Sequence, residues 1–120
     1  MEKPAIQVYQ DFFQAMLSKT DVWQSMITDD VKLTGPLAQV EGKEAFIAVN
    51  TPFFASITAC QQLKVVEIGN TVVTQIITEV GMPNGKTITL AVSEWYDIAD
   101  GKIASLKVYF DTFEFRNAFA

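Results

Sequence analysis

The chain has 120 residues, of which 49% are hydrophobic and 19% are charged, and we expect one domain over residues 1–120. A net charge of −5 disfavours a nucleic-acid partner, because phosphate binding depends on clustered Lys and Arg. One cysteine and no histidine exclude an intrachain disulfide, a thiolate or imidazole metal site, and a Ser-His or Cys-His nucleophile pair. We therefore expect no metal and no other cofactor, and acid–base chemistry would have to use Asp, Glu, Tyr or Lys.

The start of the chain, Met-Glu-Lys-Pro, lacks the apolar run of a signal peptide. No stretch of the sequence approaches the roughly 20 apolar residues of a membrane span. We therefore expect a soluble cytoplasmic protein without a membrane partner.

Two helices are predicted in the first 30 residues. Between Pro4 and Ser18 the apolar side chains recur at intervals of three and four, as on one face of an amphipathic helix, and Pro4 suits the first turn. Thr20-Asp21 then offers an N-cap for a shorter helix that ends at Asp29-Asp30.

A short strand and a third helix are predicted next. Alternation from Val31 indicates a strand that stops at Gly35-Pro36 and enters a loop. The run from Gly42 to Ile57 is predicted to be helical, with Pro52 marking a kink or a boundary.

The second half of the chain is predicted to be an antiparallel meander of four strands. These segments are rich in Val, Ile, Thr and aromatic residues. Each is followed by a short break, containing Gly with Asn, Pro or Asp, of the kind that closes a hairpin. The predicted strands are Gln62–Ile68, Thr71–Val80, Lys86–Ile98 and Lys102–Phe110.

The tail begins with Asp111-Thr112-Phe113-Glu114, which has the D-x-x-E form of a capping box, so a terminal helical turn is predicted over residues 113–119. Asp111 is accordingly interpreted first as a helix cap, in preference to a catalytic acid. Helices followed by long antiparallel strands predict an α+β fold in which the helices cover one face of a curved sheet. Such a sheet forms a cone, which is a common place for a ligand.

Three segments carry a resemblance to a known family: T-D-D-V-K-L-T-G-P followed by V-E-G-K-E-A-F, then W-Y-D-I-A-D-G-K-I, and then L-K-V-Y-F-D. With these segments and this order of helices and strands, the chain resembles the nuclear transport factor 2-like superfamily. It is most similar to the small SnoaL-like members, which are related to polyketide cyclases, ketosteroid isomerase and limonene epoxide hydrolase. The resemblance implies a cone-shaped α+β barrel, with a curved, mostly antiparallel sheet covered by three helices from the first half of the chain.

The catalytic positions of these relatives are mostly empty in this chain. Matching the segments puts Gly35 where ketosteroid isomerases have their aspartate base, and Phe12 or Phe13 where they have an oxyanion tyrosine. The position of their second oxyanion donor, a protonated aspartate, corresponds to Glu94. The positions that hold and activate water in limonene epoxide hydrolases correspond to Leu33, Gly35, Ile76, Thr78 and Val108. The resemblance therefore implies the fold but neither activity.

Glu94 is the candidate catalytic residue. Alternation along its strand puts Glu94 on the apolar face between Val92 and Tyr96, where burial would disfavour the charged form and raise the pKa of the carboxyl. A protonated Glu94 could act as a general acid or donate a hydrogen bond to a ligand carbonyl. Two alternatives are open: the alternation fails near the end of the strand, or a lysine such as Lys102 or Lys107 pairs with Glu94.

A small apolar molecule is the expected ligand, held inside the cone. By resemblance the last strand lines the cone, whereas the aromatic residues of the first two helices either cover its mouth or are plain core. By resemblance Asn50, on the third helix, matches a place where ketosteroid isomerases can carry a pocket tyrosine, but it is interpreted first as an exposed helical residue. The candidate ligand-binding residues are Tyr9, Phe13, Trp23, Leu33, Ile76, Thr78, Val108 and Phe110.

Trp95 and Tyr109 are predicted on the outer face of the sheet. Large aromatic residues there, in a chain rich in apolar residues, suggest that a second subunit covers this face, as members of the superfamily commonly dimerise. Two functions remain open. One is an apolar pocket for a small molecule, with isomerase- or cyclase-type acid–base chemistry through Glu94. The other is a non-catalytic binding or dimerisation module whose cone is only a core.

Overall fold

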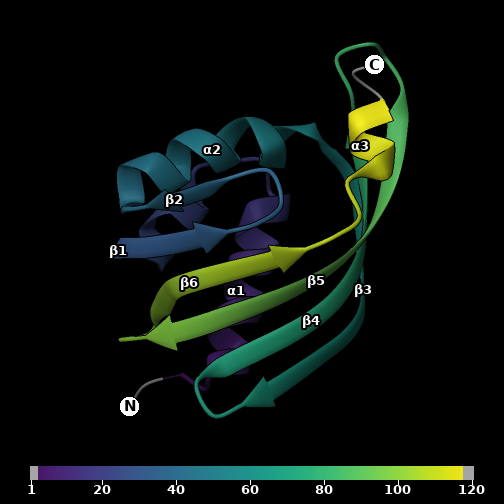
Figure 1. The fold of residues 1–120 in the computed structure, drawn as a ribbon. Helices are drawn as coiled ribbons and strands as arrows, with labels where there is room; N and C mark the ends of the chain where they lie inside the picture. The colour runs from purple at the N-terminus through teal and green to yellow at the C-terminus, as the bar shows by residue number, and fades with distance from the viewer. Residues whose placement is uncertain (1–2, 118–120) are drawn as a thin grey trace.

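A computed structural model describes residues 3–117, in which helices cover a strongly curved six-stranded sheet (Figure 1). This arrangement confirms the predicted α+β cone. Within residues 3–117, no helix has the length and apolar character needed to cross a bilayer. The elements in chain order are α1 (Ala5–Leu17), the 3₁₀ helix η1 (Val22–Met26), β1 (Ile27–Thr34), β2 (Gln39–Glu41), α2 (Lys43–Ser56), β3 (Ile57–Ile68), β4 (Thr71–Gly81), β5 (Thr87–Ala99), β6 (Lys102–Tyr109) and α3 (Phe113–Asn117).

The strand order of the sheet is β2-β1-β6-β5-β4-β3, and all neighbours are antiparallel except β1 and β6. Strands β3 to β6 form the predicted meander. At its last turn Asp100 and Gly101 have φ angles of 54° and 74°, as in the two-residue turns that match the twist of a hairpin. The parallel β1–β6 pair and the short β2 were not predicted, and they extend the sheet on the side of β6.

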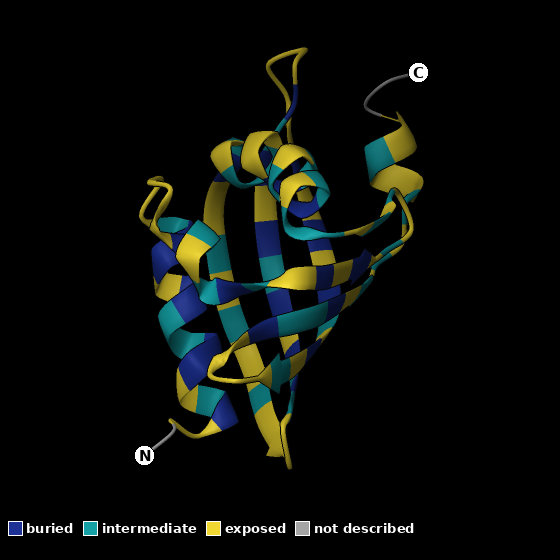
Figure 2. Cartoon of the chain, turned by 90° about the vertical axis from the view of Figure 1, so that its left-hand side faces the viewer, coloured by how far each residue is buried: buried dark blue, intermediate teal, exposed yellow. Residues whose placement is uncertain are grey.

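Helix α1 packs against the inner face of the curved sheet (Figures 1 and 2). Its predicted apolar face is buried, and Tyr9, Phe12 and Phe13 are at most 5% exposed. Residues along β4 and β5 alternate between buried and exposed, and Val72 and Tyr96 belong to the same buried cluster as the helix. This alternation puts the apolar set of each strand inside the cone.

The second predicted helix and the first predicted strand differ from the structure. The helix is a short 3₁₀ helix, and Asp21 makes no capping hydrogen bond with its side chain. Asp29-Asp30 do not end a helix, since both are exposed residues within β1, which begins at Ile27. The register with β6 shifts between Ile27 and Lys32, and such an irregularity lets two consecutive residues face solvent.

The third predicted helix is one continuous element. Helix α2 runs through Pro52 and ends at Ser56, so Pro52 is not a boundary. Strand β3 then starts directly at Ile57, well before the predicted Gln62, because Ile57 already pairs with Val80 on β4.

Two charged side chains bind the ends of helices. Lys19 Nζ donates hydrogen bonds to the carbonyl oxygens of Phe54 and Ala55, at 2.8 and 3.2 Å, where α2 ends. Glu67 on β3 accepts a hydrogen bond of 2.8 Å from the backbone N–H of Ile6, where α1 begins. Because helix ends carry unpaired backbone groups and partial charges, both contacts fix a helix to a distant part of the chain.

The predicted terminal turn is present as α3, whereas Ala118 and Phe119 lie outside the described residues. Asp111 accepts a hydrogen bond of 2.9 Å from the backbone N–H of Phe113. This contact fits the interpretation of Asp111 as the residue that caps the start of α3.

Candidate functional site

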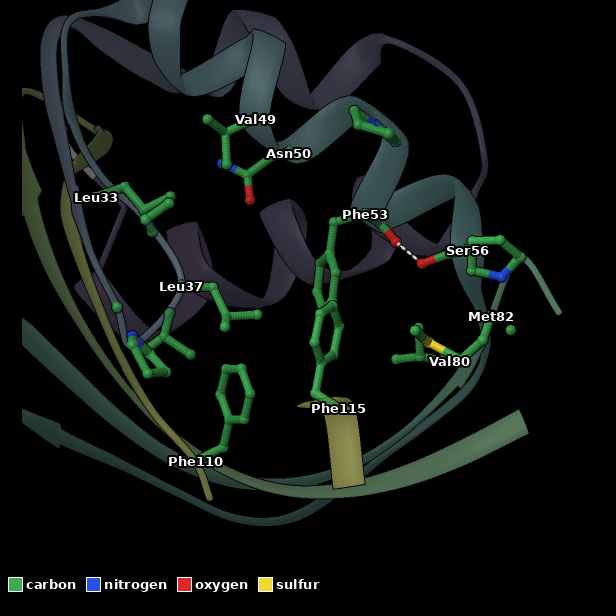
Figure 3. Close-up of a pocket in the computed structure, with 17 residues that line it drawn as sticks. Leu33, Leu37, Val49, Asn50, Phe53, Ser56, Val80, Met82, Phe110 and Phe115 are labelled. Atoms are coloured by element: carbon green, nitrogen blue, oxygen red, sulfur yellow. Dashed lines mark hydrogen bonds between the residues drawn. The ribbon is translucent and has the colours of Figure 1, made fainter. Parts of the chain in front are cut away.

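An apolar pocket of about 610 Å³ lies at one end of the cone (Figure 3). Its walls come from the β1–β2 loop, helix α2, the β4–β5 hairpin and the segment that leads into α3. We call this region the open end of the cone. The lining residues are Leu33, Gly35, Pro36, Leu37, Ala38, Val49, Asn50, Pro52, Phe53, Ser56, Val80, Gly81, Met82, Pro83, Val108, Phe110 and Phe115.

Helix α2 forms one wall of the pocket because four of its residues share a face. Phe46, Val49, Asn50 and Phe53 follow the three- and four-residue spacing of one helical face. Phe46 is fully buried, whereas Val49 and Phe53 line the pocket. Both Phe53, from α2, and Phe115, from α3, line the pocket, and Figure 3 shows the two side chains there.

Asn50 brings a polar group into this apolar pocket. It is only 6% exposed, so the expectation of an exposed helical residue is wrong. The physical reason is its position one turn from Phe46 and close to Phe53 on the buried face of α2. Its Nδ2 donates a hydrogen bond of 3.0 Å to the carbonyl oxygen of Phe46, and its oxygen points toward the hollow (Figure 3).

Glu94 faces the inside of the cone, as the alternation predicted. It lies directly across from Thr74 on β4 and from Val108 on β6. Thr74 Oγ1 donates a hydrogen bond of 3.2 Å to Glu94 Oε1. Within residues 3–117 the ion pairs are Lys3–Asp11 and Lys32–Glu41, so the alternative in which Lys102 or Lys107 pairs with Glu94 does not hold.

The polar groups around Glu94 form a compact cluster beneath α1. The rings of Tyr9 and Tyr96 are 4.8 Å apart, and Gln62 Nε2 donates a hydrogen bond of 3.0 Å to the Tyr9 hydroxyl. Burial raises the pKa of Glu94 to about 7, although hydrogen bonds from Tyr96 and Thr74 act in the opposite direction. Burial, followed by the nearby charge of Glu94, also raises the pKa of both tyrosines. With a pKa of about 7, a substantial fraction of Glu94 is therefore protonated at neutral pH.

The structure separates Glu94 from the lining of the pocket. Glu94 is not a lining residue, whereas its neighbour across the sheet, Val108, is. Tyr9, Phe13 and Trp23 are buried in the core with α1 and do not line the pocket. The polar cluster and the pocket therefore occupy different parts of the cone, with Val108 between them.

The other predicted ligand-binding residues lie at or beside the pocket. Leu33, Val108 and Phe110 line it. Ile76 is buried in a cluster that includes Val108 and Phe110. Thr78 is buried on the same face of β4, with its Oγ1 3.5 Å from Cys60 Sγ. Within residues 3–117, no three Cys, Asp or Glu side chains gather as metal ligands would.

Several lining residues were not among the predicted ones. They come from α2, through Val49 and Phe53, from the β4–β5 hairpin, through Met82, and from α3, through Phe115. The helical spacing of Val49 and Phe53 was a signal that could have placed both on one buried face. Met82 and Phe115 gave no such signal, because only the folded chain brings the hairpin and α3 together.

Comparison with known proteins supports this fold. An NTF2-like protein of unknown function from Cytophaga hutchinsonii is 25% identical, with a TM-score of 0.75, and the match covers 100% of this chain and 98% of that one. An LEH-like epoxide hydrolase from M. tuberculosis is 15% identical, with a TM-score of 0.80 and coverage of 95% and 87%. TerC, co-crystallised with polyporic acid, is 19% identical, with a TM-score of 0.79 and coverage of 97% and 98%.

At identities this low, structural likeness supports the shared fold and not a shared activity. No curated protein matches the sequence significantly. The profile of the SnoaL-like domain, however, matches residues 9–106, which is most of the chain. The protein therefore belongs to the SnoaL-like domain family, within the nuclear transport factor 2-like superfamily.

Proposed function

We propose that this protein binds a small, mostly apolar molecule in the pocket at the open end of the cone. One observation carries the proposal: this end is a hollow of about 610 Å³ whose walls are almost entirely apolar side chains. Apolar hollows of several hundred Å³ with few polar groups are typical of small-molecule sites. A cone that served only as a core would gain stability by filling this space, since unfilled apolar space costs free energy.

A structural neighbour adds support for an organic ligand. TerC was co-crystallised with polyporic acid, and it covers 97% of this chain with a TM-score of 0.79. At 19% identity the two chains share a fold, but the ligand cannot be transferred from one to the other. The ligand of this chain has to be found by experiment.

Titration of the ¹⁵N-labelled protein with 2-methylnaphthalene tests the pocket. Saturable shift changes are expected for the backbone amides of α2 and of the β4–β5 hairpin. Val49→Trp should abolish these changes, because the indole would occupy the pocket from α2. Ala48→Trp is the matched control, since Ala48 is exposed on the same helix, and it should bind as the wild type does. Absence of saturable binding, or equal binding by Val49→Trp, would contradict the proposal.

A second candidate function is isomerase- or cyclase-type acid–base chemistry through Glu94. The observation that favours it is the carboxyl with a pKa of about 7, inside the cone and next to the pocket residue Val108. A protonated carboxyl in such a site can donate a hydrogen bond to a carbonyl oxygen and stabilise the charge that develops there. The ligand would have to reach past Val108 to make this contact.

The pH dependence of binding tests this second function. If a carbonyl ligand such as 2-acetylnaphthalene contacts protonated Glu94, it should bind more tightly at pH 5 than at pH 8. Glu94→Gln should remove that dependence, because its amide donates a hydrogen bond at both pH values. An affinity that is independent of pH in the wild type would argue against any contact between the ligand and Glu94.

We also propose that the outer face of the sheet forms a homodimer. Trp95 and Tyr109 are 44% and 54% exposed, and cross-strand pairing puts Trp95 in one row with Val73 and the exposed Val66. A second subunit would cover this apolar surface. Sedimentation of a monomer at micromolar concentration would refute the dimer.

Finally, we propose a cytoplasmic location, with neither nucleic acid nor a membrane as partner. Cys60 is a free thiol, which a reducing compartment preserves. The net charge of −5 opposes binding to phosphate-rich surfaces. Fractionation of cells that express the tagged chain would check the location.

A further inference from the structure

We infer that the ligand of the pocket is a neutral molecule that carries a hydrogen-bond donor, and that Asn50 is the residue that selects it. This inference rests on the proposed function and narrows its ligand class. It starts from the amide of Asn50, which is 6% exposed and yet belongs to the pocket lining. A polar side chain buried this deeply normally has its hydrogen bonds satisfied.

The orientation of the Asn50 amide follows from its partner. One end of the amide lies 3.0 Å from the carbonyl oxygen of Phe46, one helical turn earlier. A carbonyl oxygen can only accept, so the amide nitrogen has to be the atom at this position. The amide oxygen, Oδ1, is therefore the atom that faces the pocket, as Figure 3 shows.

Oδ1 of Asn50 is an unused acceptor that the pocket can reach. The hydrogen bond of the Asn50 side chain within residues 3–117 uses Nδ2 and leaves Oδ1 without a partner. In the same range, Thr28 Oγ1 is the side-chain oxygen that is fully sealed from solvent and has no hydrogen-bond partner. Asn50 Oδ1 is thus not sealed off, and the space that it contacts is the hollow. An acceptor in this position invites an O–H or N–H group.

Apart from Asn50, the pocket lining offers a ligand few polar side chains to contact. Among the described residues that line the pocket, the other polar side chain is Ser56, and its hydroxyl already donates to the carbonyl oxygen of Phe53 at 2.6 Å. The lining residues within 3–117 include no charged side chain, so an ammonium or carboxylate group would be desolvated without a counter-ion from them. The pocket therefore suits an alcohol, a phenol or a neutral N–H compound with an otherwise apolar body.

Three ligands of matched size test this inference: 2-naphthol donates a hydrogen bond, 2-methoxynaphthalene only accepts, and 2-methylnaphthalene does neither. At pH 7 the wild type should bind 2-naphthol about tenfold more tightly than the other two, as expected for one buried hydrogen bond. Asn50→Leu should remove this advantage and leave the affinity for 2-methylnaphthalene unchanged or improved. Ala48→Leu, on the exposed side of α2, should keep the wild-type order.

The comparison on the wild type decides the matter even if Asn50→Leu does not fold. Equal affinity for 2-naphthol and 2-methylnaphthalene would overturn the inference and leave the pocket function standing. An equal gain for 2-methoxynaphthalene would also overturn it, because the amide would then act as a donor. If none of the three ligands binds, both the inference and the proposed function fail.

Discussion

Glu94→Gln is the substitution for which the structure gives the sharpest expectation. The pKa of Glu94 rises from 4.5 to about 7 on folding, mainly because the surrounding side chains desolvate the carboxyl, although the residue as a whole is half-buried. Since one pKa unit corresponds to about 1.4 kcal/mol, ionising the half-buried Glu94 in the folded chain costs at most about 3 kcal/mol more than in the unfolded chain. Glutamine has almost the same shape and no charge, so it should escape this cost.

The sign of the pH dependence follows from proton binding. Between pH 4.5 and pH 7 the folded chain holds a proton on Glu94 that the unfolded chain has released. The free energy of unfolding of the wild type should therefore fall as the pH rises through this window, and the loss should be complete above pH 7. Relative to the wild type, Glu94→Gln should be neutral near pH 4.5 and stabilised by about 1–3 kcal/mol at pH 8. The lower value applies if the new amide leaves one of its N–H groups unpaired.

Urea denaturation at pH 4.5, 6 and 8 would measure this difference, with Glu79→Gln as the control. Glu79 is an exposed residue on the outer face of β4, so its substitution should shift stability by the same small amount at each pH. Thermal melts should agree, at about 4 °C per kcal/mol for a domain of this size. A stabilisation by Glu94→Gln that is the same at pH 4.5 and pH 8, or a destabilisation at pH 8, would refute a buried carboxyl that is costly to ionise.

Two further predictions concern the ends of the helices. Lys19→Met should lower the free energy of unfolding by about 1 kcal/mol, because Lys19 Nζ donates to the carbonyls of Phe54 and Ala55 at the end of α2. If urea denaturation detects no loss of stability, solvent replaces these hydrogen bonds. Glu67→Ala should lower the free energy of unfolding by about 1 kcal/mol, because it removes the acceptor for the Ile6 N–H. Glu67→Gln keeps an acceptor oxygen and should cost less than half of that. Equal losses for both variants would show that the charge of Glu67, and not its acceptor oxygen, stabilises the helix.

The sequence predicted those parts of the fold that depend on local patterns. The alternation in β4 and β5 put Glu94 on the inner face, and the Asp100-Gly101 turn indicated a hairpin between β5 and β6. Both features arise from neighbouring residues, so a single sequence contains them. The parallel pairing of β1 with β6 was missed because its partners, such as Leu33 and Leu106, are far apart in the chain and carry no mutual signal.

Boundaries between elements were predicted less well, for a physical reason. Ile57 follows α2 directly, and its β-branched side chain suits a helix end or a strand start, so only its pairing with Val80 decides for the strand. Asn50 shows the same limit at the site. Its residue type favoured an exposed position, whereas its helical spacing from Phe46 and Phe53 favoured burial. In the structure Asn50 is buried, so the helical spacing was the better guide.

The sequence predicted an apolar pocket inside the cone, but it could not give the position of the hollow, because the hollow is a space that the packing leaves open. Apolar residues from α1, β4 and β5 fill the cone beneath α1, and the polar cluster around Glu94 completes that part. At the open end, Phe53 and Phe115 line a space that the side chains leave unfilled. Val108 belongs to both regions, since it pairs with Glu94 and lines the pocket. Among the described residues, a ligand on the pocket side of Val108 meets the polar side chains of Asn50 and Ser56, which suits the proposed binding function. The proposed acid–base chemistry would require a ligand that displaces Val108 and reaches its cross-strand neighbour Glu94, so the packing of Val108 bears directly on that proposal.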